Sequence, residues 1–346
     1  MLIHKLCTGE EVQRCEKAII VRFAGEKRVL ATAPHNGGLR EDLTALFNRD
    51  ETAEAEGGIT MRAPTYAGHL AALSEDLGLD PATTVGISTA AQMENAAICT
   101  RRSGATEVTA IVTAGVGVNG GRVGDPASWD ELAEEYLIHH GTINILLFIS
   151  AELSPGAMAR SLVTCTEAKT AALQELLVPS RYSRGLATGT GTDGTIIVSH
   201  KGGKCLENAG KHCKLGELIG LAVKEAVREA LYRQSGLCPA GQCHVLQRLG
   251  RFGITAETLP GDRLGLLEQE HLVAKVSLIS HLMDQLSWGL LSRSAVFAAA
   301  EPLLDGIYPA PAELRHGVND KEDAVDALAG CLRERLELLL RNEEEA

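Results

Sequence analysis

The feature that most constrains the fold is a long apolar stripe in the segment "KLGELIGLAVKEAVREALYRQ", which begins at residue 214. Its apolar residues recur at the i, i+3, i+4, i+7 spacing of one helix face. They are Leu215, Leu218, Ile219, Ala222, Val223, Ala226, Val227 and Ala230. Such a helix is stabilised mainly by packing, so its stripe must lie on a sheet or on another helix.

A second helix and several strands are predicted around it. Ser154 can cap a helix that has Pro155 at its first position and persists to about Leu177. β-Branched runs bounded by Gly, Asn or Asp predict strands at 18–23, 28–33, 84–89, 107–116, 142–150 and 194–200. The first two flank the turn-forming "AGEK" and predict a hairpin. Several strands are apolar on both faces, which predicts a sheet covered on both sides.

The region after Gly236 is helical in pattern, notably over about 264–299 and 321–342. We therefore expect an α/β (α+β) domain over residues 1–235, in which mixed, largely antiparallel sheets are flanked by long helices. A helical C-terminal extension over residues 236–346 should follow. An apolar face on that extension would suit a homodimer interface.

The net charge and the hydropathy of the sequence limit the classes of partner that the protein is expected to bind. The formal net charge is −12, whereas binding to nucleic acid or to anionic membranes needs basic patches. The N-terminus lacks the apolar core of a signal peptide, and the longest apolar run, "INILLFISA", is about half a membrane span. We expect a cytoplasmic protein that binds a small molecule, with no nucleic acid and no membrane partner.

The number and spacing of the cysteines do not favour a metal-binding site. The nine cysteines are an odd number and are scattered, so most should be free and buried in a reducing compartment. Cys205, Cys213, Cys238 and Cys243 share one window, but zinc sites prefer tighter, repeated pairs. Packing is the expected role, with a metal or redox role as the alternative. No pair of His at ligand spacing occurs in residues 1–235, and we expect no metal site.

Two polar clusters lie at the ends of predicted strands. The Gly-rich loop "TAGVGVNGGRVGDP" (113–126) carries Asn119 and Asp125 and can hold an anion or an oxyanion, although it also reads as an ordinary turn. "GTIN" (141–144) begins the most apolar strand. Thr142 there is either a nucleophile presented at a strand end or simply a β-former.

Two more clusters lie on the predicted helices. In "TCTEAKTAA", Glu167 and Lys169 are too close in sequence to share a helix face, so one of them can point into a site. "GKHCKLGE" gathers cations around His212 and Lys214 at a helix N-terminus, where they oppose the helix dipole. His212 is a candidate general acid or base, and Glu217 lies one turn further along.

Six segments, in this order, resemble the adenosylcobinamide amidohydrolase family. They are "ISTAAQMENAAI", "TAGVGVNGGRVGDP", "GTINILLFISAELSPGAM", "TEAKTAAL", "ATGTGTDG" and "AGKHCKLGELIG". The resemblance covers roughly residues 18–232. It implies hydrolysis of the amide that joins aminopropanol to the corrin ring of adenosylcobinamide, which yields adenosylcobyric acid for coenzyme B12 salvage. The corrinoid is then the substrate, and no cofactor is implied.

Lys211 and Cys213 depart from the family pattern, in which small hydroxyl residues are expected at both positions. The resemblance therefore does not imply the fine substrate preference. A fainter similarity in layout, over residues 141–200, is to the aminopeptidase and ornithine acetyltransferase families. In those families a Ser or Thr nucleophile opens a strand, the chain is cut before it, and the fold is a four-layer αββα sandwich. By that resemblance Thr142 is the nucleophile and the Gly141–Thr142 bond is a cleavage site.

The predicted mechanism assigns four catalytic residues. Thr142 attacks the amide carbonyl, donors of the Asn119 loop hold the oxyanion, and His212 protonates the leaving amine. Asp193 is a general acid or base, or it binds the amides at the rim of the corrin together with the alternating threonines of "TGTGTDG". The predicted substrate-binding residues are Asp125, Asn144, Glu167, Lys169, Thr188, Thr190, Thr192, Lys214 and Glu217.

The sequence also allows two alternatives to catalysis by a Thr142 nucleophile. One is water attack driven by Asp193 or Glu217, without a covalent intermediate. The other is a corrinoid-binding or sensing protein that has lost turnover. A phosphate-binding protein is a weaker reading, because no "GxxxxGK[ST]" follows a strand.

Overall fold

The computed structural model describes residues 1–52, 61–127, 130, 141–259, 263–309 and 323–341. The chain divides into two compact units. The first comprises Met1–Tyr182 and Leu186–Cys238, and the second comprises Ser183–Gly185 and Pro239–Ala346. The expected mixed α/β class with a helical C-terminal region is confirmed, whereas the domain boundary near residue 235 stays a prediction.

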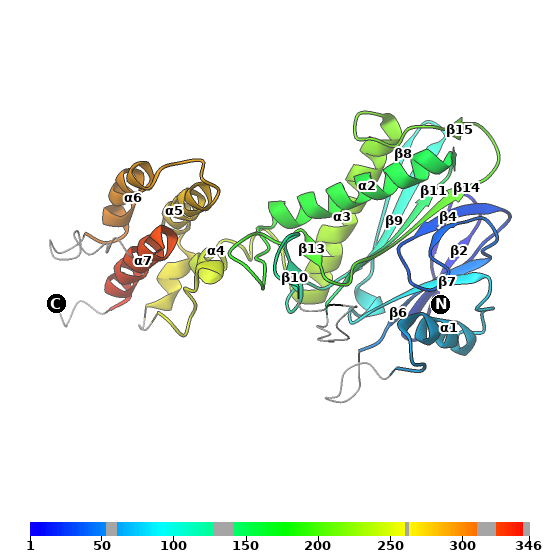
Figure 1. The fold of residues 1–346 in the computed structure, drawn as a ribbon, viewed down its shortest axis with the longest axis horizontal. Coiled ribbons are helices and arrows are strands. Elements are labelled where there is room, and N and C mark those ends of the chain that lie inside the picture. Colours follow the sequence, from blue (N-terminus) through cyan, green and yellow to red (C-terminus); the bar gives the residue numbers. More distant parts are fainter. Residues whose placement is uncertain (53–60, 128–129, 131–140, 260–262, 310–322, 342–346) are drawn as a thin grey trace. The chain divides into compact units, whose positions relative to one another are not determined.

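Two large sheets form the first unit (Figure 1). One has the order β1-β2-β3-β6-β7, with bounds Leu2–Lys5, Glu11–Cys15, Ala18–Arg22, Ala45–Asp50 and Thr84–Thr89. The other has the order β5-β4-β14-β11-β9-β8, with bounds Gly38–Arg40, Lys27–Ala31, Gly194–His200, Ile143–Ile149, Thr106–Ala114 and Ala97–Ser103. Within these sheets β6–β7 and β11–β14 are parallel and the other pairs are antiparallel.

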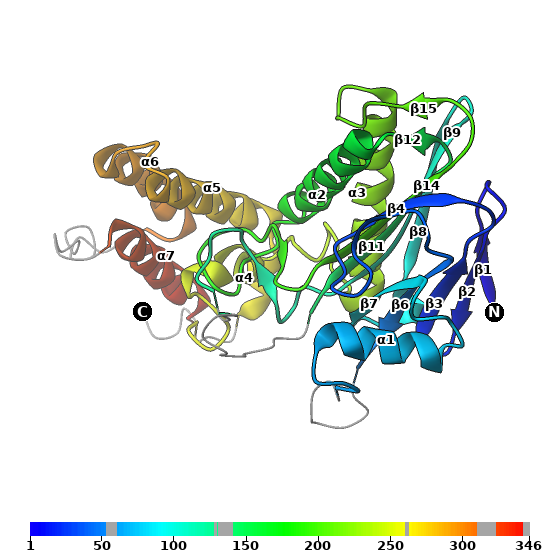
Figure 2. The same cartoon turned by 45° about the vertical axis from the view of Figure 1, so that its right-hand side comes forward.

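Helices cover both outer faces of the stacked sheets, as Figures 1 and 2 show. Helix α1 (Tyr66–Asp76) packs on the first sheet through a cluster that includes Phe47 and Leu70. The two sheets meet through a second cluster that includes Leu46 and Leu146. Helices α2 (Pro155–Glu175) and α3 (Lys214–Ser235) cover the second sheet. The layers are helix, sheet, sheet and helix, so the expected αββα sandwich is confirmed.

The strand at the centre of the second sheet explains why its sequence is so apolar. All residues of β11 are buried, because one face contacts the other sheet and the opposite face contacts the helices. The prediction of a sheet covered on both sides is therefore confirmed.

The predicted hairpin of 18–23 and 28–33 is wrong. β3 pairs with β2 and β6, whereas β4 pairs with β14 and β5 in the other sheet. The turn at "AGEK", where Gly25 has a φ of 74°, is a corner between the layers. A strand–turn–strand pattern has the same local signal in both cases, and only the positions of distant strands distinguish them.

The two long helices confirm their predicted signals. Ser154 Oγ caps α2 by accepting from Ala157 N at 3.2 Å, and Pro155 is its first residue. All eight residues of the predicted stripe are buried in α3, which ends at Gly236 with a left-handed φ of 72°. The thiol of Cys213 caps α3, accepting from Gly216 N at 3.5 Å and donating to Asn208 O at 3.3 Å.

The second unit has its own apolar core, centred on residues such as Leu249, Val276 and Leu332. Its α-helices are α4 (Val245–Leu249), α5 (Glu270–Ser287), α6 (Arg293–Ile307) and α7 (Ala324–Leu340). The helical pattern over 264–299 is interrupted, because Gly289 has a φ of 69° and Ser292 caps a new helix. Among the residues that the structure describes, no helix is both long enough and apolar enough to cross a bilayer.

The cap of α3 yields a stability prediction. A thiol is a weak hydrogen-bond acceptor and a hydroxyl a strong one, so Cys213→Ser should raise the free energy of unfolding by about 0.5–1 kcal/mol. Cys213→Ala should lower it, because it leaves Gly216 N without its acceptor. Urea unfolding followed by circular dichroism measures both, and equal stability of the three proteins would contradict the capping role.

Candidate active site

Two parallel strands bring the main sequence-predicted residues together. β11 and β14 are neighbours in register, with Asn144 opposite Gly194. Thr142 directly precedes β11 and Asp193 directly precedes β14. The polar segments "GTIN" and "TGTGTDG" therefore meet at one edge of the second sheet, although they lie 50 residues apart.

Thr142 is held by a second hydroxyl. Its side chain is buried, and its Oγ1 lies 2.5 Å from Thr192 Oγ1. Thr192 Oγ1 also donates to Gly141 O at 2.9 Å. Because each hydroxyl carries one proton, Thr142 is the donor to Thr192. Its hydroxyl hydrogen then points at Thr192, and its oxygen lone pairs are directed elsewhere, as a nucleophile requires.

The carbonyl beside this hydroxyl has two donors. Gly141 O accepts from Asn119 Nδ2 at 3.1 Å and from Thr192 Oγ1 at 2.9 Å. Gly141 has a φ of 135°, and a Cβ at this position would lie 3.0 Å from Asn119 Cβ. Only glycine fits this backbone without strain. The glycine before Thr142 is thus needed for the close approach of Asn119.

Asp193 ties the site together. Its Oδ1 accepts from Ile143 N at 2.9 Å and from Thr190 Oγ1 at 2.6 Å. Its Oδ2 accepts from Thr190 N at 3.0 Å and forms an ion pair with Lys169 Nζ. Both side chains of the ion pair are about seven-eighths buried. Because both oxygens of the carboxylate are engaged, the geometry favours a positioning role for Asp193 over proton transfer.

Asn144 lies deeper and links the two sheets. It is 1% exposed, and its Nδ2 donates to Asn48 Oδ1 at 2.8 Å and to Ser88 O at 2.9 Å. Its Oδ1 accepts from Gly194 N at 3.1 Å. Both polar atoms of the Asn144 amide are therefore bonded within the protein. Its role in binding a substrate stays a prediction. No sequence pattern points to Asn48, whose partner Asn144 is 96 residues away.

The Gly-rich loop closes onto the threonine segment. β10 (Gly120–Gly121) pairs with β13 (Gly189–Thr190), and Thr188 Oγ1 accepts from Val123 N at 2.9 Å. Asp125 Oδ2 accepts from Arg122 N at 2.8 Å and from Ser180 Oγ at 2.5 Å. Asn119, Asp125, Thr188 and Thr190 therefore belong to one framework around Thr142.

The other predicted residues lie outside this framework. Glu167, His212, Lys214 and Glu217 are exposed. Lys214 Nζ lies 2.6 Å from Glu217 Oε2, and Lys211 Nζ lies 3.7 Å from Glu167 Oε1. Within the described part of the chain, no hydrogen bond or ion pair joins these residues to Thr142 or Asp193. Their roles toward a substrate stay predictions.

The cysteines are free, but the expectation that most are buried is wrong. Only Cys99 and Cys165 are buried, and burial raises their pKa values to about 11 and about 12. Cys205 is exposed, and Cys213, Cys238 and Cys243 are partly exposed. Among the described residues, no group of three or more His, Cys, Asp or Glu side chains is placed to hold a metal ion.

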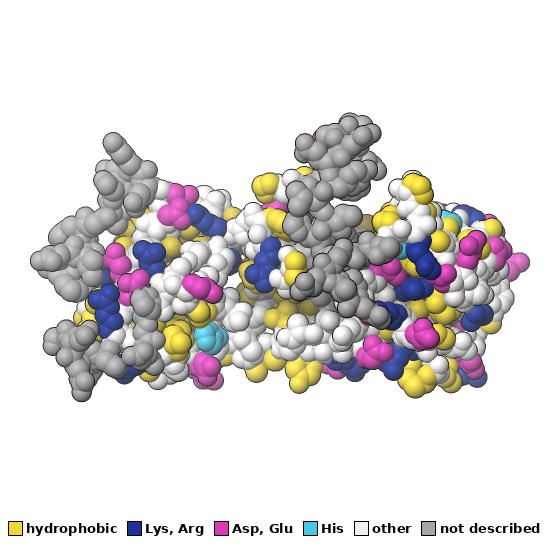
Figure 3. Space-filling view, turned by 90° about the horizontal axis from the view of Figure 1, so that it is seen from below, with side chains coloured by type: hydrophobic (Ala, Val, Ile, Leu, Met, Phe, Trp, Pro, Cys, Tyr) yellow, Lys and Arg dark blue, Asp and Glu magenta, His cyan; other side chains and the backbone are white. Residues whose placement is uncertain are grey.

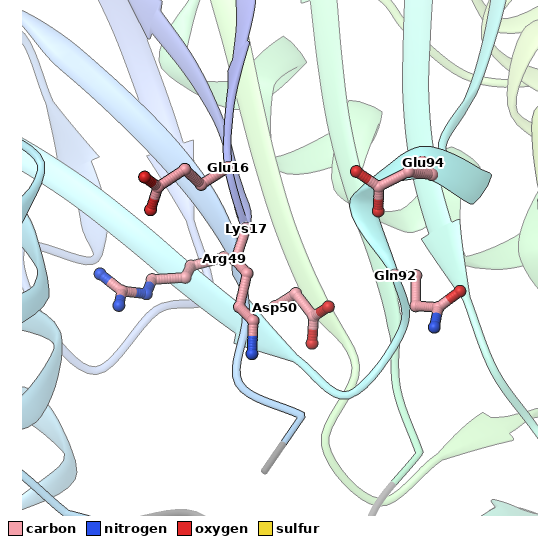
Figure 4. Close-up of a pocket in the computed structure, with 6 residues that line it drawn as sticks. All are labelled: Glu16, Lys17, Arg49, Asp50, Gln92 and Glu94. Atoms are coloured by element: carbon pink, nitrogen blue, oxygen red, sulfur yellow. The ribbon is translucent and has the colours of Figure 1, made fainter. Parts of the chain in front are cut away.

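A polar pocket lies beside the first sheet, which has the order β1-β2-β3-β6-β7. Its lining residues are Glu16, Lys17, Arg49, Asp50, Gln92 and Glu94, which Figure 4 draws around it. Gln92 and Glu94 lie in the segment "ISTAAQMENAAI", and none of the six residues is one that the sequence predicts for the site. On the face drawn in Figure 3, basic and acidic side chains are interspersed, with no continuous basic field.

The glycines of "TGTGTDG" yield a prediction. A Cβ at Gly189 would clash with Asp193 Oδ2 and lie 2.8 Å from Lys169 Nζ. Gly189→Ala should therefore push the ion pair apart and lower the free energy of unfolding by about 1–3 kcal/mol. The control is Gly220→Ala in α3, where a Cβ meets nothing within 4 Å and stability should rise by about 0.5–1 kcal/mol. Thermal unfolding compares them, and a Gly189→Ala protein as stable as wild type would refute the packing argument.

Two comparisons with known proteins indicate the family. An uncharacterized protein of Methanocaldococcus jannaschii is 32% identical over 238 residues, which are 63% of this chain and 87% of that protein. The family model of adenosylcobinamide amidohydrolase matches residues 3–239, a range that includes all of the framework around Thr142. The chain belongs to the adenosylcobinamide amidohydrolase family.

Proposed function

We propose that this protein hydrolyses the amide between aminopropanol and the corrin ring of adenosylcobinamide, giving adenosylcobyric acid in coenzyme B12 salvage. The family match supports an amidohydrolase. The observation that carries the proposal is the geometry at Thr142, whose hydroxyl lies beside a carbonyl that receives two hydrogen bonds. Asn119 Nδ2 carries a second N–H, which suits the oxyanion of a substrate amide.

In the proposed reaction Thr142 Oγ attacks the amide carbon and gives up its proton, which is later delivered to the leaving amine, and the carbonyl oxygen becomes an oxyanion. Asn119 Nδ2 is the candidate donor to it, through the second of its two N–H groups, and one such donor contributes on the order of 3 kcal/mol to lowering the barrier. The C–N bond then breaks, the amine leaves with a proton, and water hydrolyses the ester on Thr142. Lys169 is a cation inside the network, paired with Asp193, and His212 stays the candidate that the sequence offers for this proton.

The substrate-facing groups follow from the same framework. We propose that Thr188, Thr190 and Thr192 form a polar wall for the amides at the rim of the corrin. Glu167, Lys214 and Glu217 would contact a more distant part of this large substrate from the exposed surface of α2 and α3. The corrinoid is the only small-molecule partner that we propose, with no further cofactor. A homodimer formed through the helical extension stays a prediction.

The non-enzymatic alternative rests on the departures at Lys211 and Cys213. Each has a structural explanation outside the framework around Thr142. Lys211 pairs with Glu167, and Cys213 caps α3. They therefore give no reason to expect that turnover has been lost.

The nucleophile assignment is tested by substitution. Thr142→Ala removes the attacking oxygen and should abolish hydrolysis, lowering the rate by more than about 1,000-fold, while the melting temperature changes little. Thr195→Ala is a control, because Thr195 lies in β14 two residues after Asp193 and has no role in the proposed reaction. Retention of near wild-type turnover by Thr142→Ala would refute the assignment. Intact mass of the protein after quenching a single turnover then distinguishes an acyl-enzyme, which carries the added acyl group of the substrate, from direct water attack, which adds nothing to the chain.

We also propose that the chain can cleave itself between Gly141 and Thr142. Thr142 Oγ would attack the Gly141 carbonyl, whose oxygen already accepts from Asn119 and Thr192. The peptide bond is then exchanged for an ester, and water releases residues 1–141 and a new amine on Thr142. Intact mass should show the two fragments in wild type and a single chain in Thr142→Ala. An active protein that remains full length would exclude self-cleavage, while leaving Thr142 as nucleophile.

A further inference from the structure

We infer that Tyr182 is a positioning residue that sets the orientation of the Asn119 amide toward the reacting carbonyl. This inference rests on the proposed function, because it concerns the donor that would hold the oxyanion. Tyr182 lies in the segment after α2 and was not singled out by any sequence pattern. In this role it acts through Asn119.

The contact is direct. Tyr182 Oη donates to Asn119 Oδ1 at 2.7 Å, and Asn119 Nδ2 donates to Gly141 O at 3.1 Å. Asn119 is 4% exposed, so its amide is nearly removed from water. The three groups form a chain of hydrogen bonds from a phenol, through an amide, to the carbonyl beside Thr142.

The direction of that chain matters for catalysis. An Asn side chain has an acceptor oxygen on one side and a donor nitrogen on the other. The proton of the Tyr182 phenol satisfies the oxygen, so the nitrogen faces the position where negative charge develops. If the amide turned by 180°, its oxygen would face the oxyanion and repel it. The phenol also polarises the amide and strengthens its N–H donor.

The phenol is itself held in place. Tyr182 N donates to Ser180 Oγ at 3.0 Å, and Ser180 Oγ donates to Asp125 Oδ2 at 2.5 Å. A Cβ on Gly121 would lie 3.2 Å from the Tyr182 ring, and the absence of a side chain at Gly121 therefore leaves room for the ring. The predicted residue Asp125 thereby supports the site by fixing the segment that carries Tyr182.

Kinetics of the full chain with adenosylcobinamide test the inference. Asn119→Ala should lower kcat by about 100- to 1,000-fold. Tyr182→Phe keeps the ring but removes the donor, and should lower kcat by about 10- to 100-fold with KM within about twofold. The double variant should be no slower than Asn119→Ala within about twofold, because Tyr182 acts only through Asn119. Tyr66→Phe removes a phenol that is bonded to Ser88 Oγ at 2.6 Å on the α1 side of the first sheet, and should leave kcat unchanged.

A spectroscopic measurement separates this inference from the proposed function. The side-chain amide signal of Asn119 is identified in a ¹⁵N–¹H spectrum by its absence from Asn119→Ala. It should shift in Tyr182→Phe and stay in place in Tyr66→Phe. An unchanged Asn119 signal in Tyr182→Phe, or multiplicative loss of kcat in the double variant, overturns the positioning role. A wild-type protein that does not hydrolyse adenosylcobinamide refutes the proposed function instead, and the amide signal still decides whether Tyr182 orients Asn119.

Discussion

The candidate site depends on the carboxylate of Asp193. It accepts from the backbone of Ile143, from Thr190 and from Lys169. One group thus fixes the start of β11, the start of β14 and the middle of α2 relative to one another. Each hydrogen bond to a carboxylate contributes about 1.5–3 kcal/mol. These bonds also keep Thr142 and Thr192 close enough for their hydroxyls to form a hydrogen bond.

Small residues make this convergence sterically possible. Gly189 leaves room for the Asp193–Lys169 pair, and Gly194 for Asn144. Gly141 adopts a backbone that other residues avoid and lets Asn119 approach. The alternation of threonine and glycine that is so conspicuous in "TGTGTDG" therefore has two causes. The threonines supply hydroxyls to the network, and the glycines leave space for the polar groups of neighbouring elements.

Periodic and local features of the fold could be predicted from the sequence. The stripe of α3, the Ser154–Pro155 start of α2 and the strands β9, β11 and β14 follow from spacing, capping and β-branched runs. The hairpin at 18–33 was wrong because local turn signals do not tell a hairpin from a corner between sheets. Patterns of side-chain spacing describe neighbours along one element, and they carry no information about which elements pair.

The residues of the candidate site also fall into those that the sequence predicts and those that only the structure reveals. Thr142, Asn119 and Asp193 stand in unusual polar segments, so each could be picked out as a candidate before any contact was known. Asn48 and Tyr182 could not, because a single Asn in a strand and a single Tyr in a loop are common. Their importance comes from contacts across 96 and 63 residues of chain. His212 shows the converse, since it stands in a distinctive segment yet is exposed and outside the network.

The most direct test of the account is to incubate the purified full chain with adenosylcobinamide and follow products by chromatography with mass detection. Adenosylcobyric acid and 1-amino-2-propanol should appear in equal amounts, with repeated turnover. An intact corrinoid that co-elutes with the protein would contradict it and indicate a binding protein. A corrinoid that neither reacts nor binds would refute the proposed substrate.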